Sequence, residues 1–372
     1  MLISELLFWV FIAFAGIQFI FYLLVIIVLA GYKSGKDQEA PNIDGISVVV
    51  SSKNEFENLK ELIPKLLAQN YSRFEVILVD DRSQDETYDY GIKWQQEHAI
   101  FKLVRIDTTP DHIHNKKYAI TLGIKAAQYD HILLTDADCI PHSDQWISEM
   151  SGGFRQDNKV FAIGYSPYQV TKGFLNLFIR YETLHTALHY VGLGLLGRPY
   201  MAVGRNIAYK KSFFLENNGF GKFQHVVGGD DDLLVNQLAT RKNTSFILSP
   251  ESAVYSKPKT SWKEFVRQKT RHMSVGKHYK FTDKVLLGLL SLSKIGVWAG
   301  CIAVILSGFQ LYFALGAFIL VMVSLLSCLL LLKKKTGDKT SIWMLPFLDF
   351  AFLFYYISTG LKVLLTKKVR WK

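Results

Sequence analysis

The chain has 372 residues, of which 49% are hydrophobic, and a formal net charge of +11. This length allows one large domain with membrane segments or two modest soluble domains. Many lysines and arginines flank long apolar stretches, where membrane orientation and anionic lipid account for them, so the charge does not indicate nucleic-acid binding. The three cysteines are widely spaced without a C-x-x-C, which argues against a disulfide framework or a zinc site.

An apolar stretch opens the chain. Residues 4–30 carry one charge, Glu5, at their outer edge, and they are long enough to cross a bilayer core of about 30 Å. A cleaved signal peptide is the alternative, but its apolar region is about 7–15 residues long and follows a basic segment that is missing here. Lys33 and Lys36 follow, and lysines beside a span mark the cytoplasmic side. We predict a transmembrane helix within 1–32, in the inner (plasma) membrane, followed by a cytoplasmic domain.

Short apolar runs alternate with helical patterns in the next part of the chain. The predicted strands are 46–50, 75–80, 101–107 and 131–136, and the predicted helices are 57–69 and 117–128. Such alternation predicts an α/β fold, Rossmann-like, with a parallel sheet and right-handed crossovers. Pro64 lies inside the first helical pattern and predicts a kink there.

The following part is less regular. Strands are predicted at 160–165, 202–209 and 246–249, and an apolar, aromatic helix at 174–196 belongs either to the core or against the membrane. We therefore predict one cytoplasmic domain over 43–283. It divides into a donor half (about 43–150), an acceptor half (about 151–257) and an interfacial helix (about 259–283).

The C-terminal region, 284–372, is predicted to be embedded in the membrane. Residues 285–332 hold two spans with a turn near 307–310, and a third apolar segment covers 341–365. Three complete spans would place the basic tail, 367–372, outside, against the positive-inside tendency. Pro346 and Asp349 favour instead a hairpin or an interfacial segment and a cytoplasmic tail. The charges of Lys294, Asp349 and Lys362 within apolar segments indicate function or proximity to an interface.

Carboxylates follow two of the predicted strands, at the sheet edge where α/β proteins bind ligands. Asp80 and Asp81 end the second strand, and Asp136-x-Asp138 follows the fourth. Magnesium prefers one or two carboxylates together with substrate phosphates, although short acidic pairs also occur in ordinary turns. A departing diphosphate needs such a charge to neutralise it. No G-x-G-x-x-G follows the first predicted strand, and no P-loop motif is present, so dinucleotide and P-loop binding lose their main support.

Two later motifs carry further candidate chemistry. The run Asp230, Asp231 and Asp232 either begins a helix, whose dipole favours carboxylates, or supplies a general base whose pKa is raised by its like-charged neighbours. Gln268 and Arg271 share one helix face, and Arg pairs well with phosphate, but a membrane-surface helix would look similar.

A histidine pair offers a further metal-site alternative. His185 and His189 lie one helical turn apart, but no Glu follows His185, so the H-E-x-x-H pattern is absent.

Together, these motifs resemble those of family 2 glycosyltransferases of the GT-A fold. This inverting, often membrane-bound group includes cellulose, hyaluronan and ceramide-glucosyl synthases. The family shows V-D-D-x-S-x-D, G-K-x-x-A-L, D-x-D, E-D and Q-x-x-R-W in this order. The corresponding segments here are 79–85, Lys116 with 119–120, 136–138, 230–232 and 268–271, spread across roughly 46–280.

The resemblance implies roles for these residues on the donor side. The pocket for the nucleotide base would be lined by Ser51, Lys53, Glu55 and Asp81. Lys116 would lie on the ribose or phosphate side. Asp136 would contact the sugar nucleotide, and Asp138 would bind the metal, Mg²⁺ or Mn²⁺.

On the acceptor side the resemblance makes Asp230 the general base. Asp231 is its rival, because consecutive carboxylates leave the register open by one residue. The diphosphate and the acceptor would be held by Asp232, Gln268 and Arg271.

Three departures from the family pattern stand out. Gly229 replaces the Glu of E-D, Asn115 replaces the Gly before Lys116, and His272 replaces the Trp of Q-x-x-R-W. The last departure argues against processive polymer synthesis, because that Trp shapes the acceptor end in the polymer synthases.

We therefore predict an inverting transferase that moves a sugar from a nucleotide sugar, expected to be a UDP-sugar, to a lipid-linked or envelope saccharide acceptor at the cytoplasmic membrane face. One alternative is a glycolipid synthase that adds a single sugar to a membrane lipid. Another is a non-catalytic membrane partner that retains the fold, against which the intact acidic motifs argue. A transporter is the fourth, although so few spans enclose no obvious solute path.

Overall fold

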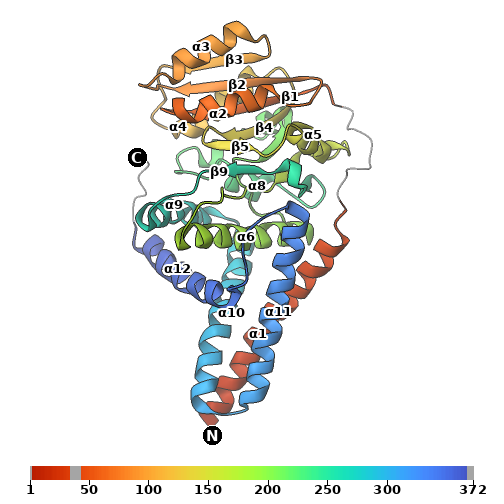
Figure 1. Cartoon of the computed structure of the whole chain (residues 1–372), viewed down its shortest axis with the longest axis vertical. Coiled ribbons are helices and arrows are strands. Elements are labelled where there is room, and N and C mark those ends of the chain that lie inside the picture. The colour runs from red at the N-terminus through yellow and green to blue at the C-terminus, as the bar shows by residue number, and fades with distance from the viewer. Residues whose placement is uncertain (1, 34–42, 367–372) are drawn as a thin grey trace.

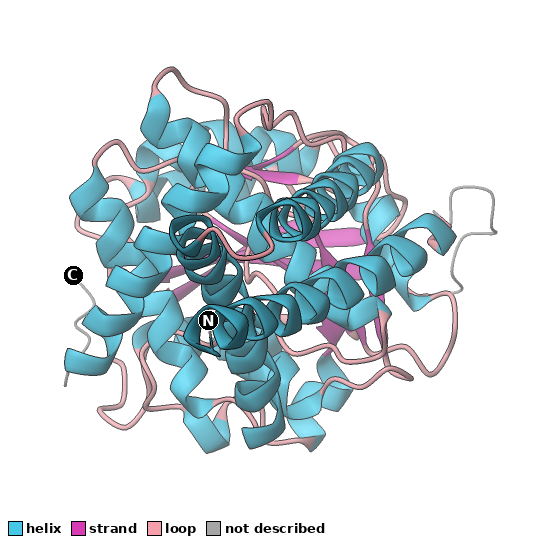
Figure 2. Ribbon diagram, turned by 90° about the horizontal axis from the view of Figure 1, so that it is seen from below, coloured by secondary structure: helices cyan, strands magenta, loops and turns pink. Residues whose placement is uncertain are grey.

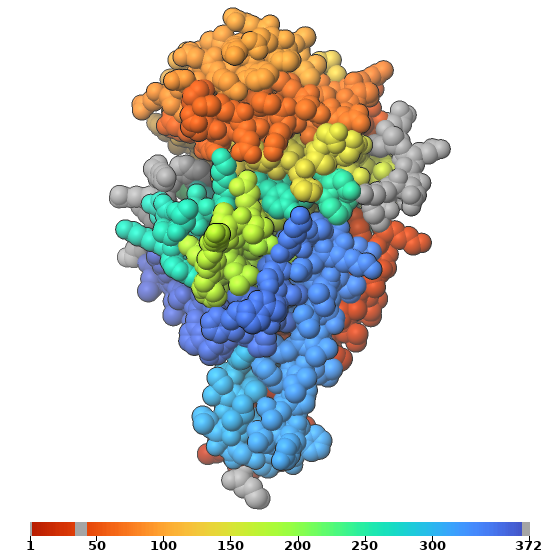
Figure 3. Space-filling view, in the orientation of Figure 1, coloured from red at the N-terminus to blue at the C-terminus, as the bar shows by residue number. Residues whose placement is uncertain are grey.

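The computed structural model describes residues 2–33 and 43–366. An α/β domain sits on a narrow stalk of long helices (Figure 1), and the domain overhangs the stalk (Figure 3). Lys36 and the basic tail lie outside the described residues.

Within the described residues, seven strands form the main sheet in the order β3-β2-β1-β4-β7-β6-β8. The strands are β1 (Ile46–Ser52), β2 (Phe74–Asp81), β3 (Phe101–Ile106), β4 (His131–Asp136), β6 (Phe161–Gly164), β7 (Ile207–Lys210) and β8 (Thr244–Ile247). The strands β3, β2, β1 and β4 run parallel, as the sequence predicts. Beyond them the sheet is mixed, because β7 is antiparallel to both β4 and β6. A parallel sheet is therefore correct only for the first half of the domain.

Helices cover both faces of the parallel half. They are α2 (Phe56–Leu67), α3 (Thr87–Glu97), α4 (Asn115–Ala126) and α5 (Trp146–Ser151). Side chains alternate along a strand, so Val48 packs in one core with α2 and α5, and Val49 packs in the other with α4. Gly123 of α4 lies directly on Val49, with no room for a Cβ, which brings this helix close to the sheet. The helix α2 continues through Pro64 and ends one turn later.

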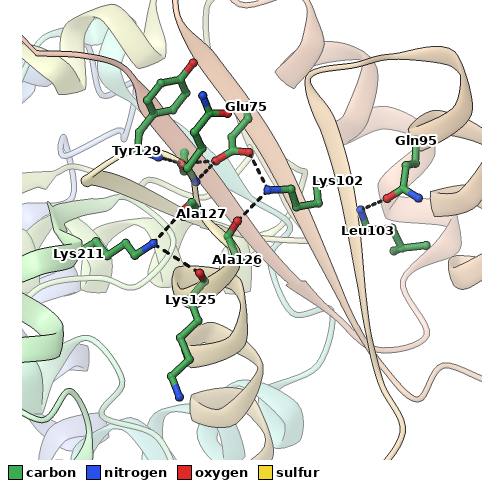
Figure 4. Close-up of polar contacts among 11 residues, drawn as sticks. Glu75, Gln95, Lys102, Leu103, Lys125, Ala126, Ala127, Tyr129 and Lys211 are labelled. Atoms are coloured by element: carbon green, nitrogen blue, oxygen red, sulfur yellow. Dashed lines mark hydrogen bonds and ion pairs between the residues drawn. The ribbon is translucent and has the colours of Figure 1, made fainter.

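Polar contacts anchor the C-terminal end of α4 (Figure 4). Lys102 donates to the carbonyl of Ala126 at 2.8 Å, and Lys211 donates to that of Ala127 at 2.7 Å. Lys102 also pairs with the buried carboxylate of Glu75 at 3.3 Å. These lysines satisfy carbonyls that a helix end leaves without an intrahelical partner. The N-terminal end of α4 therefore lies at the carboxyl ends of the strands.

The second half of the domain is built around α6 (Phe174–Leu195), a buried helix that packs against both the sheet and the stalk. The remaining elements are β5 (Cys139–Pro141), which pairs with β9 (Val254–Ser256), and the helices α7 (Lys211–Glu216), α8 (Asp232–Leu238) and α9 (Trp262–Val275). The strand predicted at 202–209 begins only at Ile207. The preceding residues form a turn, in which Asn206 N donates to the carbonyl of Val203 at 3.0 Å.

Within the described residues, four helices are long and apolar enough to cross a membrane. They are α1 (Leu2–Gly31), α10 (Phe281–Ser307), α11 (Leu311–Thr336) and α12 (Leu345–Leu365). The helices α1, α10 and α11 pack into the stalk and lie in front of the sheet when seen from below (Figure 2). Gly308, with φ +68°, ends α10, where the sequence predicts the turn.

The last helix leaves the stalk. α12 packs against α6, α9 and α10, and it rises beside the domain (Figure 1). The hairpin alternative for this segment is wrong, because α12 is one continuous helix. Pro346 occupies its first turn, where the missing N–H has no intrahelical partner to lose.

A buried polar cluster joins α6, α10 and α12. Lys294 Nζ lies 2.5 Å from Asp349 Oδ1 and also donates to His185 Nε2 at 2.7 Å. Tyr181 and Trp298 each donate to Asp349 at 2.8 Å. Lys294 and Asp349, two of the three charges that the sequence places in apolar segments, thus neutralise each other. His185 serves as a partner of Lys294, which disfavours a metal at the histidine pair.

Asp349→Ala should destabilise the protein strongly. It leaves Lys294 buried without its counter-ion, and breaking a buried pair costs about 3–5 kcal/mol. The thermal unfolding midpoint in detergent measures this loss. Glu57→Ala is the matched control, because it removes a solvent-exposed partner of Lys60 and should leave the midpoint close to that of the wild type. Equal midpoints for the two variants would show that the cluster contributes no stability.

Candidate active site

A cavity of about 1710 Å³ opens at the carboxyl ends of β1 and β4 and reaches the membrane helices. Every predicted site residue lines it: Ser51, Lys53, Glu55, Asp81, Lys116, Asp136, Asp138, Asp230, Asp231, Asp232, Gln268 and Arg271. Motifs that are far apart in the chain therefore face one space.

Two loops at the donor end of the cavity are tied together. Asn54 N donates to Ser83 Oγ at 2.9 Å, and Gln84 N donates to Asn54 Oδ1 at 2.7 Å. Asn54 and Arg82 both adopt a left-handed backbone with φ +56°, which non-glycine residues adopt at a cost. The Arg82 guanidinium holds the Asp81 carboxylate at 2.7 Å. The side chain of Asp81 is thus fixed at the cavity wall.

Lys116 joins the two halves of the domain. Its Nζ lies 2.9 Å from Asp136 Oδ1 and 3.2 Å from Asp230 Oδ2. Burial by itself would lower the pKa of Lys116, but the two carboxylates raise it above its ordinary value. Burial likewise opposes ionisation of Asp230, yet Lys116 and Lys117 outweigh burial and lower the pKa of Asp230. The two lysines therefore favour the ionised form of the buried Asp230, and the raised pKa predicted from its like-charged neighbours is wrong for this residue.

Lys117 fixes the loop that carries Asp230. Its buried Nζ donates to the carbonyls of Val226 and Gly228, each at 2.5 Å, and burial lowers its pKa to about 8. The loop turns through Gly228 and Gly229, at φ +81° and +73°. A Cβ at Gly229 would also lie 2.8 Å from Leu233. Glycine at the place of the family's Glu thus follows from the local backbone.

The next two carboxylates have different surroundings. Asp231 caps α8: its Oδ1 accepts from Asp232 N at 2.8 Å and its Oδ2 from Gly204 N at 2.5 Å. Burial and the neighbouring charge of Asp230 raise the pKa of Asp231 to about 6. Burial and Asp231 also raise the pKa of Asp232, which contacts Tyr279. The helix-start interpretation of this run thus holds for Asp231.

Asp136 and Asp138 meet the requirements of a divalent cation site. They form a cluster with Cys139 in which the potential ligand atoms lie within 4.8 Å of one another. Burial raises the pKa of the Cys139 thiol, which therefore stays protonated and is a poor ligand. The remaining carboxylate pair suits Mg²⁺ or Mn²⁺, with phosphate oxygens and water as further ligands.

The helix α9 forms one wall of the cavity and packs against α12. Gln268 and Arg271 lie on the cavity side, and Lys269 forms a buried ion pair with Glu182 of α6. Burial lowers the pKa of Arg271, although Asp230 and Asp136 act in the opposite direction. The cationic end of Arg271 is therefore within electrostatic reach of both carboxylates.

Sequence reasoning missed several residues of this site. Asn54 and Arg82 shape the donor loops, and Lys117 positions the Asp230 loop. Arg205 also lines the cavity, where its guanidinium lies 4.6 Å from the ring centre of Tyr168. Lys117 directly follows the motif residue Lys116, and this position could have marked it as a candidate. No motif or spacing marks Arg205.

Comparison with known families identifies the chain. The model of glycosyl transferase family 2 matches residues 47–212, and that of glycosyl transferase family group 2 matches residues 131–357, more than half of the chain. The chain belongs to glycosyl transferase family group 2. This family 2 glycosyltransferase has the GT-A fold. Its structure superposes on a mannosyltransferase from Pyrobaculum calidifontis in complex with GDP-Man and Mn²⁺, with a TM-score of 0.60 and 18% identity over 97% of this chain and 100% of the other.

Sequence relatives cover a shorter part of the glycosyltransferase. The poly-β-1,6-N-acetyl-D-glucosamine synthase of Staphylococcus aureus is 30% identical over 133 residues, which are 35% of this chain and 30% of the relative. The synthase of Staphylococcus epidermidis is 27% identical over 129 residues, with the same coverage. The match thus spans less than a third of the length of these relatives.

Asp138→Ala should weaken binding of Mn²⁺ in the presence of a nucleotide diphosphate by at least about 100-fold, because even outer-shell changes around a metal cost about 10–100-fold. Titration calorimetry of UDP and GDP, with and without Mn²⁺, measures the effect. Asp144→Ala removes an exposed carboxylate that does not line the cavity and is the control. Full transferase activity in excess EDTA would refute the metal site.

Lys116→Met should move the acid limb of the pH profile of kcat/KM to higher pH. A base works only when deprotonated, and Lys116 keeps the pKa of Asp230 low, so its removal raises the pH at which Asp230 takes up a proton. Lys60→Met, on the exposed face of α2, should leave the limb in place. An unshifted limb in Lys116→Met would mean that Asp230 does not control it.

Proposed function

We propose that the protein is an inverting transferase that moves a sugar from a nucleotide sugar, expected to be a UDP-sugar, to a hydroxyl of a membrane-anchored acceptor. The observation that carries this proposal is the bridge that Lys116 forms between Asp136 and Asp230. This bridge places the carboxylates of Asp136 and Asp138, which suit a metal-bound diphosphate, beside the ionised, buried carboxylate of Asp230. The two groups that a single displacement needs thus face one cavity.

The donor side prepares the leaving group. Mg²⁺ or Mn²⁺ bound by Asp138 would neutralise the departing diphosphate. The nucleotide would be held by the residues of the β1, β2 and β4 ends: Ser51, Lys53, Glu55, Asp81 and Asp136. Gln268 and Arg271 would hold the diphosphate from the opposite wall, where the planar guanidinium fits phosphate oxygens.

Asp230 is the better candidate for the general base. Asp231 has the higher pKa, which favours proton uptake, but both of its oxygens already accept backbone N–H groups. Asp230 Oδ2 instead pairs with Lys116 at the cavity wall. Asp230 would take the proton of the acceptor hydroxyl as that oxygen attacks the anomeric carbon. Its partner Lys116 would then keep the base ionised between turnovers.

The distribution of charge supports a cytoplasmic active site in the inner (plasma) membrane. Lys33 follows α1, and Lys333, Lys334 and Lys335 end α11, so these lysines lie at the domain end of the stalk. The turn at the far end, residues 307–310, carries no charge. Lysines and arginines collect on the cytoplasmic side of spans, which favours a cytoplasmic domain and an N-terminus outside.

Two acceptor classes fit the family, a lipid-linked or envelope saccharide and a simple membrane lipid. The relatives from Staphylococcus are polymer synthases by name. His272 at the place of the family's Trp supports single addition instead, and so does a cavity that reaches the membrane helices. Both classes share an acceptor that is presented at the membrane.

Asp230→Asn should lower kcat by about 10²–10⁴-fold, because the amide cannot take up the proton. Donor affinity should change little, since the amide keeps the size of the carboxylate. Nucleotide release by the purified protein in nanodiscs, across a panel of UDP-, GDP- and dTDP-sugars, measures this effect. Asp231→Asn is the matched comparison and should retain more activity. If Asp231→Asn is inactive and Asp230→Asn is active, the base is Asp231; if both are active, neither is.

A further inference from the structure

The cavity continues past Asp230 along two membrane helices. Its lining residues on α10 include six that recur at helical spacing along one face: Lys284, Leu287, Gly288, Ser291, Lys294 and Ile295. On the opposite side α12 contributes Phe352, Tyr355, Tyr356 and Lys362. The active site thus has a lower extension whose walls are α10 and α12.

One side of this extension is exposed at Gly288. Gly288 is exposed, and a Cβ added there would meet no atom within 4 Å. The neighbouring outward residues are apolar and exposed: Leu289 by 44% and Leu292 by 55%. Deeper in, Ser291 Oγ and Tyr356 Oη lie 2.8 Å apart and join α10 to α12. A lipid in the bilayer therefore meets an open mouth beside Gly288.

Lysines surround this mouth. Lys284 and Lys362 are exposed and line the cavity from its two walls. Lys277 donates to the carbonyl of Val363 at 2.8 Å and so links the start of the α10 region to the end of α12. Cationic side chains near a membrane surface attract anionic lipid head groups. The mouth is thus positively charged where the walls of the extension are partly apolar.

The extension does not continue through the stalk. Among the described residues, none of α10 beyond Ile295 lines the cavity. Below that level Val297, Val304 and Leu325 are buried among the stalk helices. A growing polymer would find no path through this chain to the far end, whereas a lipid needs only the sideways opening.

We propose that the acceptor is a membrane lipid whose head group carries both a phosphate and a free hydroxyl, and that it enters sideways between α10 and α12. The proposal rests on the function proposed above and specifies its acceptor. The phosphate pairs with Lys284 and Lys362, the acyl or polyprenyl chain stays between the apolar helix faces, and the hydroxyl reaches Asp230.

The reaction then balances without another reagent. The lipid hydroxyl oxygen forms a bond to the anomeric carbon, and the bond from that carbon to the diphosphate oxygen breaks. The bonding electron pair leaves with the nucleoside diphosphate, and the hydroxyl proton passes to Asp230. A glycerophospholipid and a polyprenyl-diphosphate-linked sugar both offer the required phosphate and hydroxyl.

The test uses the full chain in phosphatidylcholine nanodiscs with a radiolabelled sugar nucleotide that the nucleotide-release panel shows to be a donor. The discs are doped with phosphatidylglycerol or with polyprenyl-diphosphate-linked N-acetylglucosamine. Phosphatidate, which lacks the hydroxyl, and diacylglycerol, which lacks the phosphate, are the lipid controls. Radiolabel should enter the organic phase with phosphatidylglycerol or with polyprenyl-diphosphate-linked N-acetylglucosamine, and with neither control lipid. The lipid that becomes labelled identifies the source of the acceptor.

Gly288→Phe should block the mouth and lower labelling of the lipid by at least about tenfold, since small displacements of a reacting group cost this much or more. Donor affinity, measured by calorimetry, should stay unchanged. Gly316→Phe is the matched control, because Gly316 of α11 is also exposed with open space around it but does not line the cavity. Lys284→Gln and Lys362→Gln should each raise the KM for the lipid about fivefold.

Full labelling by Gly288→Phe, or equal labelling of diacylglycerol, would overturn the proposal. Radiolabel found only in water-soluble saccharide, with wild-type donor binding intact, would overturn the lipid acceptor and leave the proposed function standing. A wild-type protein that binds no sugar nucleotide would instead overturn the proposed function, and the lipid route with it.

Discussion

The ion pair between Lys294 and Asp349 determines how the membrane helices meet the catalytic domain. A charge in an apolar interior is tolerated only when it is paired and hydrogen-bonded, and each of these two residues has several partners. Those partners come from α6, α10 and α12, which are far apart in the chain. The cluster therefore ties the three helices together, and α10 and α12 form walls of the cavity.

Two adjacent lysines, Lys116 and Lys117, likewise position the carboxylates of the candidate active site. The two residues are adjacent at the start of α4, yet they point to different partners. Lys116 bridges the carboxylates of Asp136 and Asp230, and Lys117 holds the loop before Asp230. Lys102 and Lys211 anchor the other end of α4 (Figure 4). Because Lys116 contacts both Asp136 and Asp230, a small shift of this helix would affect the two carboxylates together.

The sequence predicts the first half of the fold well, because β1 to β4 are short apolar runs that alternate with helical patterns. The residues that the motifs single out all line one cavity. Lys117, Arg205 and the left-handed Arg82 escaped prediction because their roles depend on contacts between distant segments. The course of α12 escaped for the same reason, since hydropathy alone does not distinguish a span from a helix that packs against α9.

The hydrophobic core fixes the position of the cavity relative to the membrane helices. One continuous core runs from the underside of the sheet, through α6, into α1, α10 and α11. Closely packed interiors resist deformation. This packing therefore fixes the distance between Asp230 and the membrane helices. A soluble acceptor would have no need of that constraint. For the lipid acceptor proposed above, whose head group would be held at the bilayer surface, a fixed distance from Lys284 and Lys362 to Asp230 would select head groups in which phosphate and hydroxyl are separated by a matching length.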